Sequence, residues 1–188
     1  MGFTPTVFEK NEKLGGMMMY GIPAYKLEKD VIESEIDVLR ELGVEFKTGV
    51  EVGKDITIEQ LKKQGYKAFY IAIGCQGGRR PGIENDTAKG TDIAVSYLKE
   101  ALDKQVPFKG DVVVVGGGNV AVDCARTAHR LDAKSVKMFS LEQRDQMPAS
   151  NEEIKETLEE GIYIENGWGP KEIKVDANGQ EKVCPVCG

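Results

Sequence analysis

The stretch "VVVVGGGNVAVDCARTAHRL", residues 112–131, runs from four valines through three glycines into a segment rich in small residues. Four consecutive valines predict a buried β-strand, and the segment 119–131 predicts a helix with a small-residue face. Between them, Gly116, Gly118 and Ala121 match the pattern G-x-G-x-x-A. This pattern indicates dinucleotide binding only where it directly follows a strand and directly opens a helix, and here it does both.

Each small residue of this turn has a physical task. Gly116 permits the tight turn, Gly118 lets the backbone approach a pyrophosphate, and Ala121 allows the helix to pack closely on the strand. The first N–H groups of the helix, together with its dipole, favour an anion at this end. The alternative is a glycine-rich turn without a ligand. We predict a dinucleotide site formed by Gly116, Gly117, Gly118, Asn119 and Val120.

The identity of the nucleotide is read about 20 residues after the glycines, at the end of the next strand. An acidic residue there binds the ribose 2′-hydroxyl of NAD, whereas arginines accept the 2′-phosphate of NADP. The segment "FSLEQRDQ", residues 139–146, offers Glu142, which favours NAD, and Arg144, which would favour NADP. The alternative is that both are solvated loop residues. We predict NAD or NADP as the ligand, with NAD preferred.

The composition limits the class of protein. The chain has 188 residues, of which 40% are hydrophobic and 30% charged, with a net charge of −6. These values are typical of a globular protein and argue against nucleic acid or an anionic membrane as the main partner. The sequence contains no apolar run of membrane-spanning length, and its N-terminus lacks the pattern of a signal peptide. We therefore expect a cytoplasmic protein.

Predicted strands and helices alternate along the chain, which is typical of an α/β fold with a parallel sheet. We predict a Rossmann-like, doubly wound parallel sheet for the nucleotide-binding part. Thr91 and Ser150 are the predicted N-caps of the helices that follow them. The predicted strands are 5–10, 44–52, 68–74, 111–116, 134–141 and 162–167, and the predicted helices are 27–42, 57–65, 91–104, 119–131 and 150–161.

Four stretches, in this order, resemble one known family: "TVFEKNEKLGGMMMYGIPAYKL" (6–27), "AFYIAIGCQGGRRPGIEN" (68–85), "VVVVGGGNVAVDCARTA" (112–128) and "QMPASNEE" (146–153). The family comprises the small (beta) subunit of glutamate synthase and related FAD-dependent pyridine nucleotide oxidoreductases. The resemblance extends to about residue 175.

The resemblance implies that NAD(P)H passes a hydride to FAD. Electrons then leave through iron–sulfur clusters in a separate segment or subunit, toward a glutamate synthase large subunit or another acceptor subunit. Because the cofactors carry the hydride chemistry, we name no catalytic residue. The family's FAD contacts map to Glu9 (adenosine ribose), Gly15 and Gly16 (flavin and phosphates), Val52 (adenine region), and Ile73 and Gly74 (the strand end beside FAD).

The sequence departs from this family pattern in two ways. Leu141 and Glu142 stand where the family commonly has two arginines, which weakens the expectation of NADP. The chain also begins at the second strand of the FAD-binding domain as the family has it, so the resemblance implies a fragment truncated at both ends that binds FAD poorly or not at all and is inactive alone. The implied organisation is a partial FAD-binding domain without its first glycine turn (1–90), an NAD(P)-binding domain (91–183) and a tail (184–188).

The cysteines suggest a different class of function. Cys184 and Cys187 form a C-x-x-C pair, which is half of a metal or redox site, so we predict no metal site here. Cys75 and Cys124 are predicted buried thiols. A Cys-based redox module and a nucleotide-binding module without turnover remain the alternatives to the enzyme.

Overall fold

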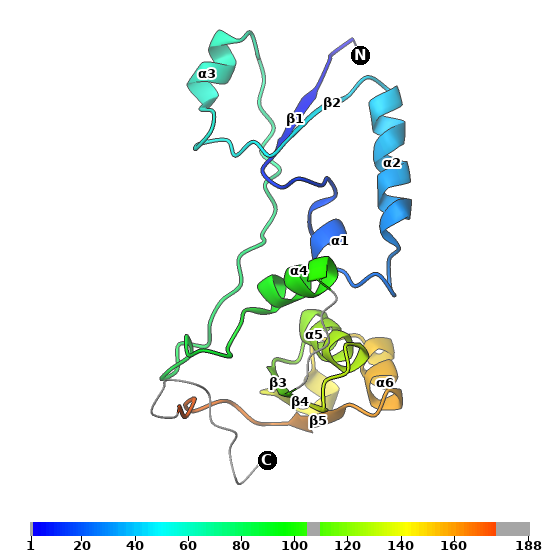
Figure 1. The fold of residues 1–188 in the computed structure, drawn as a ribbon, viewed down its shortest axis with the longest axis vertical. Helices are drawn as coiled ribbons and strands as arrows, with labels where there is room; N and C mark the ends of the chain where they lie inside the picture. The colour runs from blue at the N-terminus through cyan, green and yellow to red at the C-terminus, as the bar shows by residue number, and fades with distance from the viewer. Residues whose placement is uncertain (1, 105–109, 176–188) are drawn as a thin grey trace. The chain divides into compact units, whose positions relative to one another are not determined.

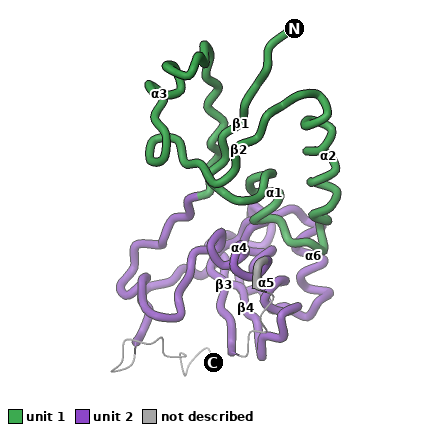
Figure 2. The backbone as a smooth tube through the Cα atoms, turned by 45° about the horizontal axis from the view of Figure 1, so that its top comes forward, with its two compact units in different colours: residues 1–76 green, residues 77–188 purple. Residues whose placement is uncertain are grey.

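The computed structural model describes residues 2–104 and 110–175. The chain forms two compact units, Met1–Gln76 and Gly77–Gly188 (Figure 2). The loop 77–90 therefore belongs to the second unit by its contacts. The predicted division between residues 90 and 91 concerns cofactor binding, and it stays a prediction.

The first unit contains a two-stranded parallel sheet with three helices (Figure 1). Strand β1 pairs with β2 from Thr6 opposite Glu45 to Glu9 opposite Thr48. A small apolar core lies under α1 and α2, formed by Leu14, Met19, Tyr20, Ile32 and Ile36. The elements are β1 (Thr6–Glu9), α1 (Gly16–Tyr20), α2 (Lys29–Glu41), β2 (Glu45–Thr48) and α3 (Ile58–Lys63).

The second unit is built on a three-stranded parallel sheet in the order β3-β4-β5 (Figure 1). Alternate residues of β4, Val136 and Met138, point into the same core as Val122 of α5 and Ile154 of α6, so both helices pack on one face of the sheet. The elements are α4 (Ala94–Lys104), β3 (Asp111–Val115), α5 (Asn119–Arg130), β4 (Ser135–Ser140), the 3₁₀ turn η1 (Arg144–Gln146), α6 (Asn151–Glu159) and β5 (Tyr163–Asn166).

Most predicted elements are confirmed to within four residues at each end, and the α/β class with parallel sheets is confirmed. Helix α1 was missed because its five residues lie inside a segment predicted as a glycine-rich loop. Ser150 caps α6 as predicted, since its Oγ accepts a hydrogen bond from the Glu153 N–H at 3.3 Å. Thr91 caps no helix, because α4 begins three residues later and the Thr91 hydroxyl donates to the carbonyls of Asp86 and Ala88.

The predicted buried strand 68–74 is wrong for this structure. These residues are assigned to no strand, and Tyr70 and Ile73 are 95% and 84% exposed. A strand buried on both faces needs neighbours for its backbone and side chains. In the described part of the chain this segment pairs with neither β1 nor β2, so its apolar sequence is left in solvent. Cys75, which follows it, is exposed rather than buried, whereas Cys124 is buried as predicted.

Candidate nucleotide-binding site

The turn between β3 and α5 requires glycine at its first position. Gly116 has φ 148, a backbone conformation that L side chains rarely adopt. Its N–H donates to the Phe139 carbonyl at 2.9 Å, which continues the β3–β4 pairing into the turn. A Cβ added at Gly116 would stand 3.2 Å from the Cβ of Ala121. The first glycine and Ala121 therefore bring the helix close to the strand, as the sequence predicts.

Gly118 has no such reason within the protein. It is the N-cap of α5 with φ −96 and ψ 172, an extended conformation open to any residue, and a Cβ built there meets nothing within 4 Å. The N–H groups of Ala121 and Val122 both donate to the Gly118 carbonyl, so helical bonding starts with these two. The N–H groups of Asn119 and Val120 precede it, as at any helix N-terminus. Gly118 thus leaves open space beside unpaired donors and the positive end of the helix dipole.

The segment that leads into α6 lies against the same turn. The Ala149 N–H donates to the Gly117 carbonyl at 2.9 Å, and the Ser150 N–H donates to Oδ1 of Asn119 at 2.9 Å. The Oδ1 atom of Asn119 therefore braces the turn from within the protein, while its backbone N–H and its side-chain Nδ2 are donors that an anion can accept. Val120 is exposed beside it.

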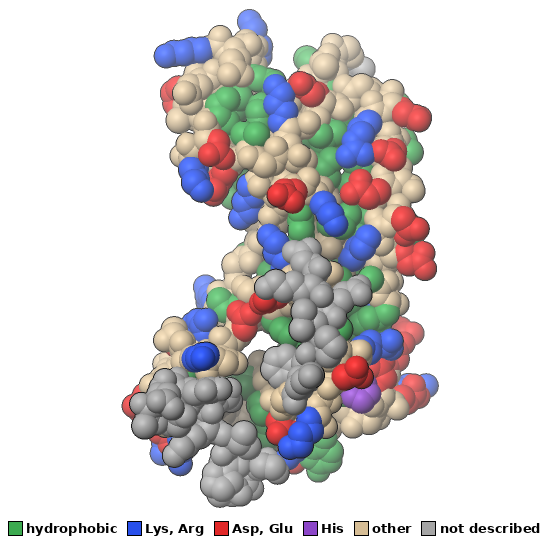
Figure 3. Space-filling model, viewed as in Figure 1, with side chains coloured by type: hydrophobic (Ala, Val, Ile, Leu, Met, Phe, Trp, Pro, Cys, Tyr) green, Lys and Arg blue, Asp and Glu red, His purple; other side chains and the backbone are tan. Residues whose placement is uncertain are grey.

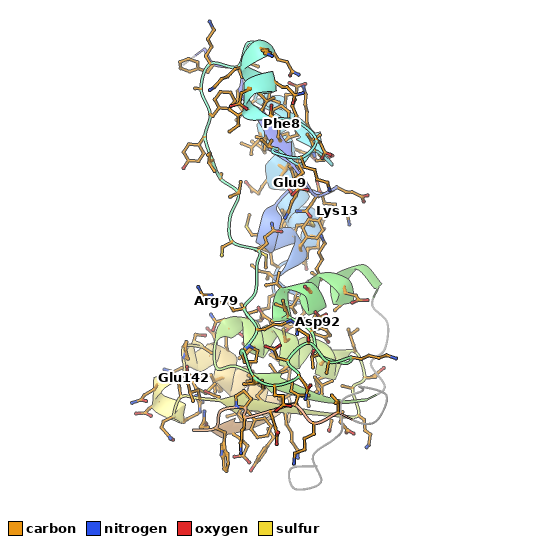
Figure 4. The ribbon with its side chains drawn as sticks, turned by 90° about the vertical axis from the view of Figure 1, so that its left-hand side faces the viewer. Phe8, Glu9, Lys13, Arg79, Asp92 and Glu142 are labelled. Carbon is orange, nitrogen blue, oxygen red and sulfur yellow. The ribbon has the colours of Figure 1, made fainter. Side chains whose placement is uncertain are left out.

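Glu142 lies two residues beyond the end of β4, where the chain turns into η1 (Figure 4). The buried Ser140 hydroxyl donates to Glu142 Oε2 at 2.8 Å, and the Glu142 N–H donates to Ser140 Oγ at 3.2 Å. The hydrogen bond from the Ser140 side chain, followed by that from its own backbone, lowers the pKa of Glu142 below its usual range. The carboxylate is therefore ionised at neutral pH. Arg144 is exposed within η1.

An ion-pair cluster fixes α5 against α6. Arg126 is buried, with Nη1 2.6 Å from Oε2 of Glu156 and Nη2 2.7 Å from Oε1 of Glu160. Glu153 joins this cluster at 3.3 Å, and Arg130 also pairs with Glu160 at 2.7 Å. Because α6 begins beside the glycine turn, Asn119 and Ser150 join the two helices at that end, and the cluster joins them from there to the Arg130–Glu160 pair at the other end.

In the first unit, Glu9 lies at the carboxyl end of β1 (Figure 4). Its Oε1 accepts hydrogen bonds from the backbone and side-chain nitrogens of Asn11, at 2.8 and 2.7 Å. The carbonyls of Glu9 and Asn11 accept the N–H groups of Val50 and Gly49, which follow β2. The carboxyl ends of both parallel strands therefore meet at Glu9, and ligands of parallel α/β sheets bind at such edges.

The other residues assigned to FAD by resemblance do not share the position of Glu9 at the carboxyl ends of the two strands. Gly15 has φ 103, and a Cβ there would stand 2.8 Å from Cγ2 of Ile32, so packing already explains this glycine. A Cβ added at Gly16 would stand 4.0 Å from Nε2 of Gln76, at ordinary contact distance. Val52 bridges Ile56 just beyond the edge where Glu9 lies. Ile73 and Gly74 lie in the exposed segment, and within the described residues no hydrogen bond joins them to Glu9.

Sequence reasoning missed three residues that shape the site: Ser140, Ala149 and Ser150. The signal for Ser140 was present, because the buried positions of β4 alternate through Val136 and Met138 and so include a serine at the strand end. Contacts of Ala149 and Ser150 with the turn depend on tertiary packing, which spacing along the chain does not reveal.

The described residues contain no group of three or more His, Cys, Asp or Glu side chains able to hold a metal ion. Cys184 and Cys187 lie outside them. Across residues 2–104 and 110–175, every helix is too short or too polar to cross a membrane. Basic and acidic side chains are intermixed over the face shown in Figure 3.

Comparison with known proteins places the chain among redox enzymes. Residues 6–185 match the family described as pyridine nucleotide-disulphide oxidoreductase. The chain is 34% identical to the glutamate synthase (NADPH) small chain of Escherichia coli K12, over 95% of the chain and 40% of that protein. It is 32% identical to the NAD-dependent dihydropyrimidine dehydrogenase subunit PreT of Escherichia coli O157:H7, over 94% of the chain and 42% of that protein.

Solved structures share the fold. FprA of Mycobacterium tuberculosis, determined in complex with NADPH, has a TM-score of 0.75 at 15% identity, over 92% of this chain and 54% of that one. The chain thus spans about 40% of the length of the two relatives and about half of FprA.

Proposed function

The chain belongs to the pyridine nucleotide-disulphide oxidoreductase family, and from this premise we propose that its glycine turn binds the pyrophosphate of NAD(P)H for hydride transfer to FAD. The observation that carries the proposal is that nothing within the protein requires glycine at position 118. Neither its backbone conformation nor any neighbouring atom calls for glycine, yet the residue adjoins the free N–H groups of a 12-residue helix. A ligand that approaches the backbone supplies the missing reason.

In this proposal each residue of the turn has one role. The N–H groups of Gly118, Asn119 and Val120 hold the pyrophosphate, and Gly116 and Gly117 shape the turn around it. Glu142 accepts hydrogen bonds from the adenosine ribose, since an ionised carboxylate at the end of the second strand suits a diol. Arg144 would serve a 2′-phosphate in its place. These two residues predict opposite preferences, and we assign the ribose to Glu142 because Ser140 holds it beside the turn.

The residues of the first unit fit FAD in part. Glu9 presents an acidic side chain at the carboxyl end of two parallel strands, with one oxygen held by Asn11. This arrangement suits the ribose of an adenine nucleotide, with Val52 nearby for the adenine region. FAD, when bound, would supply the hydride acceptor. Gly15, Gly16, Ile73 and Gly74 remain proposals from family resemblance alone, as does the division of the chain at residue 90.

For the electron path we propose iron–sulfur clusters and an acceptor subunit, such as a glutamate synthase large subunit, in a cytoplasmic complex. The support is the kinship with a glutamate synthase small chain and a dihydropyrimidine dehydrogenase subunit, both named as parts of larger assemblies. A nucleotide-binding module without turnover would bind NAD(P)H equally well. The capacity of NADH to reduce flavin in the assembled protein separates the two.

The proposed site is tested by mapping NADH on the isotopically labelled chain with amide NMR. We expect the largest shifts at the amides of Gly116–Val120 and at Glu142. Equal titration with nicotinamide mononucleotide, which lacks the pyrophosphate and the adenosine, is the control and leaves the turn amides nearly unshifted. Shifts confined to the first unit, or no shifts with NADH, would reject the site.

A further inference from the structure

The middle glycine of the turn has a reason of its own, and it differs from those of its neighbours. The backbone of Gly117 lies outside the left-handed region, so an alanine would meet no conformational strain there. A Cβ at Gly117 would instead stand 2.6 Å from Ser140 Oγ and 2.7 Å from Glu142 Oε2. Both distances are shorter than real Cβ contacts allow. Glycine at this position therefore makes room for these two oxygens.

The Ser140 side chain fixes the orientation of the carboxylate that occupies this room. Ser140 is fully buried at the end of β4, so its hydroxyl cannot turn to solvent. It donates to Oε2 of Glu142 at 2.8 Å and accepts the Glu142 N–H at 3.2 Å. Among the described residues, the structure gives Oε1 of Glu142 no hydrogen-bond partner, which leaves that oxygen available to a ligand.

We propose that Gly117 and Ser140 are positioning residues that lock the Glu142 carboxylate beside the glycine turn and so set a preference for NADH over NADPH. This inference rests on the proposed function of the turn. A ribose 2′-hydroxyl donates to the available carboxylate oxygen. The 2′-phosphate of NADPH would lie beside a carboxylate that cannot rotate away from it. The two negative charges would then repel each other. Without the hydrogen bond from Ser140, the Glu142 side chain would rotate into solvent. The exposed Arg144 would then bind the phosphate.

The test is the ratio of the NADPH and NADH dissociation constants, measured calorimetrically on the unmodified chain and on Ser140→Ala, Gly117→Ala and Gly118→Ala. We expect the unmodified chain to favour NADH. Ser140→Ala removes the hydrogen bond to the charged carboxylate, and Gly117→Ala displaces its two partners with the new Cβ, so each should lower that preference by about tenfold. Gly118→Ala is the matched control: its Cβ meets the ligand and not Glu142, so both nucleotides weaken together and the ratio stays unchanged.

A coupling measurement separates positioning from a general structural effect. If Ser140 acts through Glu142, then Ser140→Ala added to Glu142→Ala should change the ratio no further. Circular dichroism verifies that each variant is folded, and Gly117→Ala decides the question if Ser140→Ala does not fold.

Three results would overturn the inference. A preference of the unmodified chain for NADPH contradicts it, and so does an unchanged ratio in folded Gly117→Ala; in both cases nucleotide binding at the turn stands. If the folded chain binds neither nucleotide, the proposed function itself fails and the inference fails with it.

Discussion

At the scale of single residues, the three consecutive glycines of the turn are glycines for three different reasons. Gly116 is required by its backbone angle, Gly117 by the oxygens of Ser140 and Glu142, and Gly118 by nothing in the protein. These reasons lead to different expectations for the same alanine substitution. Alanine at the first position should affect the fold, alanine at the second the choice between the two nucleotides, and alanine at the third the affinity for both.

Gly116→Ala should destabilise the chain. A side chain at φ 148 is strained, and its Cβ would press on Ala121 at 3.2 Å, so we expect a loss of about 1–3 kcal/mol in the free energy of unfolding. Urea denaturation measures it. Gly77→Ala is the control, because its Cβ meets nothing and its backbone is permissive, and it should change stability by less than about 0.5 kcal/mol. Equal stability of the two variants would contradict the strain.

The cysteines give a second residue-scale prediction. Burial, together with the charges of Asp123 and Asp92, raises the pKa of Cys124 to about 12, whereas Cys75 is exposed. At pH 8 a thiol of pKa 12 has roughly a thousandfold fewer thiolates than an ordinary one. Iodoacetamide should therefore label the Cys75 peptide and leave the Cys124 peptide unmodified, as read by mass spectrometry. Comparable rates at both would show that α5 does not bury Cys124.

At the scale of elements, α5 and α6 are joined at both ends. Arg126 is buried and pairs with carboxylates of α6 and of its C-cap Glu160, so removing its guanidinium leaves those carboxylates with fewer partners. Because Glu160 keeps Arg130 and the carboxylates are partly exposed, Arg126→Ala should cost about 1.5–3 kcal/mol in the free energy of unfolding. The control is Lys155→Ala, which breaks an exposed pair with Glu159 and should cost less than about 0.5 kcal/mol. A loss of stability in Arg126→Ala no larger than that in Lys155→Ala would mean that the ion pairs of Arg126 do not form in solution.

The same cluster predicts a dependence on pH. Burial raises the pKa of Glu160, but the hydrogen bonds and charges of Arg126 and Arg130 outweigh it, so the folded-state pKa lies below the ordinary value. A lowered pKa contributes stability above the unfolded value of about 4.3, and this contribution is lost as pH falls through the folded value. The stability difference between the unmodified chain and Arg126→Ala should thus shrink as pH falls from about 5 toward 3. A difference that is constant over this range would contradict the assignment.

The elements that the sequence predicts well are those whose signal is local. Strand 111–116 and helix 119–131 appear as Asp111–Val115 and Asn119–Arg130, because valine runs and small-residue periodicity act over a few residues. The predicted strand 68–74 is wrong, because an apolar run favours burial without specifying which strand it pairs with. The turn was predictable from its glycines. The hydrogen bond from Ser140 to Glu142 was not, because it depends on the tertiary structure around the end of β4.

At the scale of the whole molecule, the chain contains two parallel α/β units, each with an acidic side chain at or just past a strand's carboxyl end. Glu9 is held by Asn11 and Glu142 by Ser140, in each case through one carboxylate oxygen and a residue two positions away. The recurrence supports our proposal of one adenine-nucleotide site in each unit. It also agrees with membership of a family defined by pyridine nucleotides.

The most direct measurement of the central claim is a calorimetric titration of NADH into the unmodified chain, Gly118→Ala and Gly77→Ala. We expect the unmodified chain and Gly77→Ala to bind with equal affinity. Gly118→Ala should bind at least about tenfold more weakly, because its methyl group occupies the space of the pyrophosphate, while its stability changes by less than about 1 kcal/mol. Equal binding by all three proteins, or binding by none, would contradict a nucleotide site at the glycine turn.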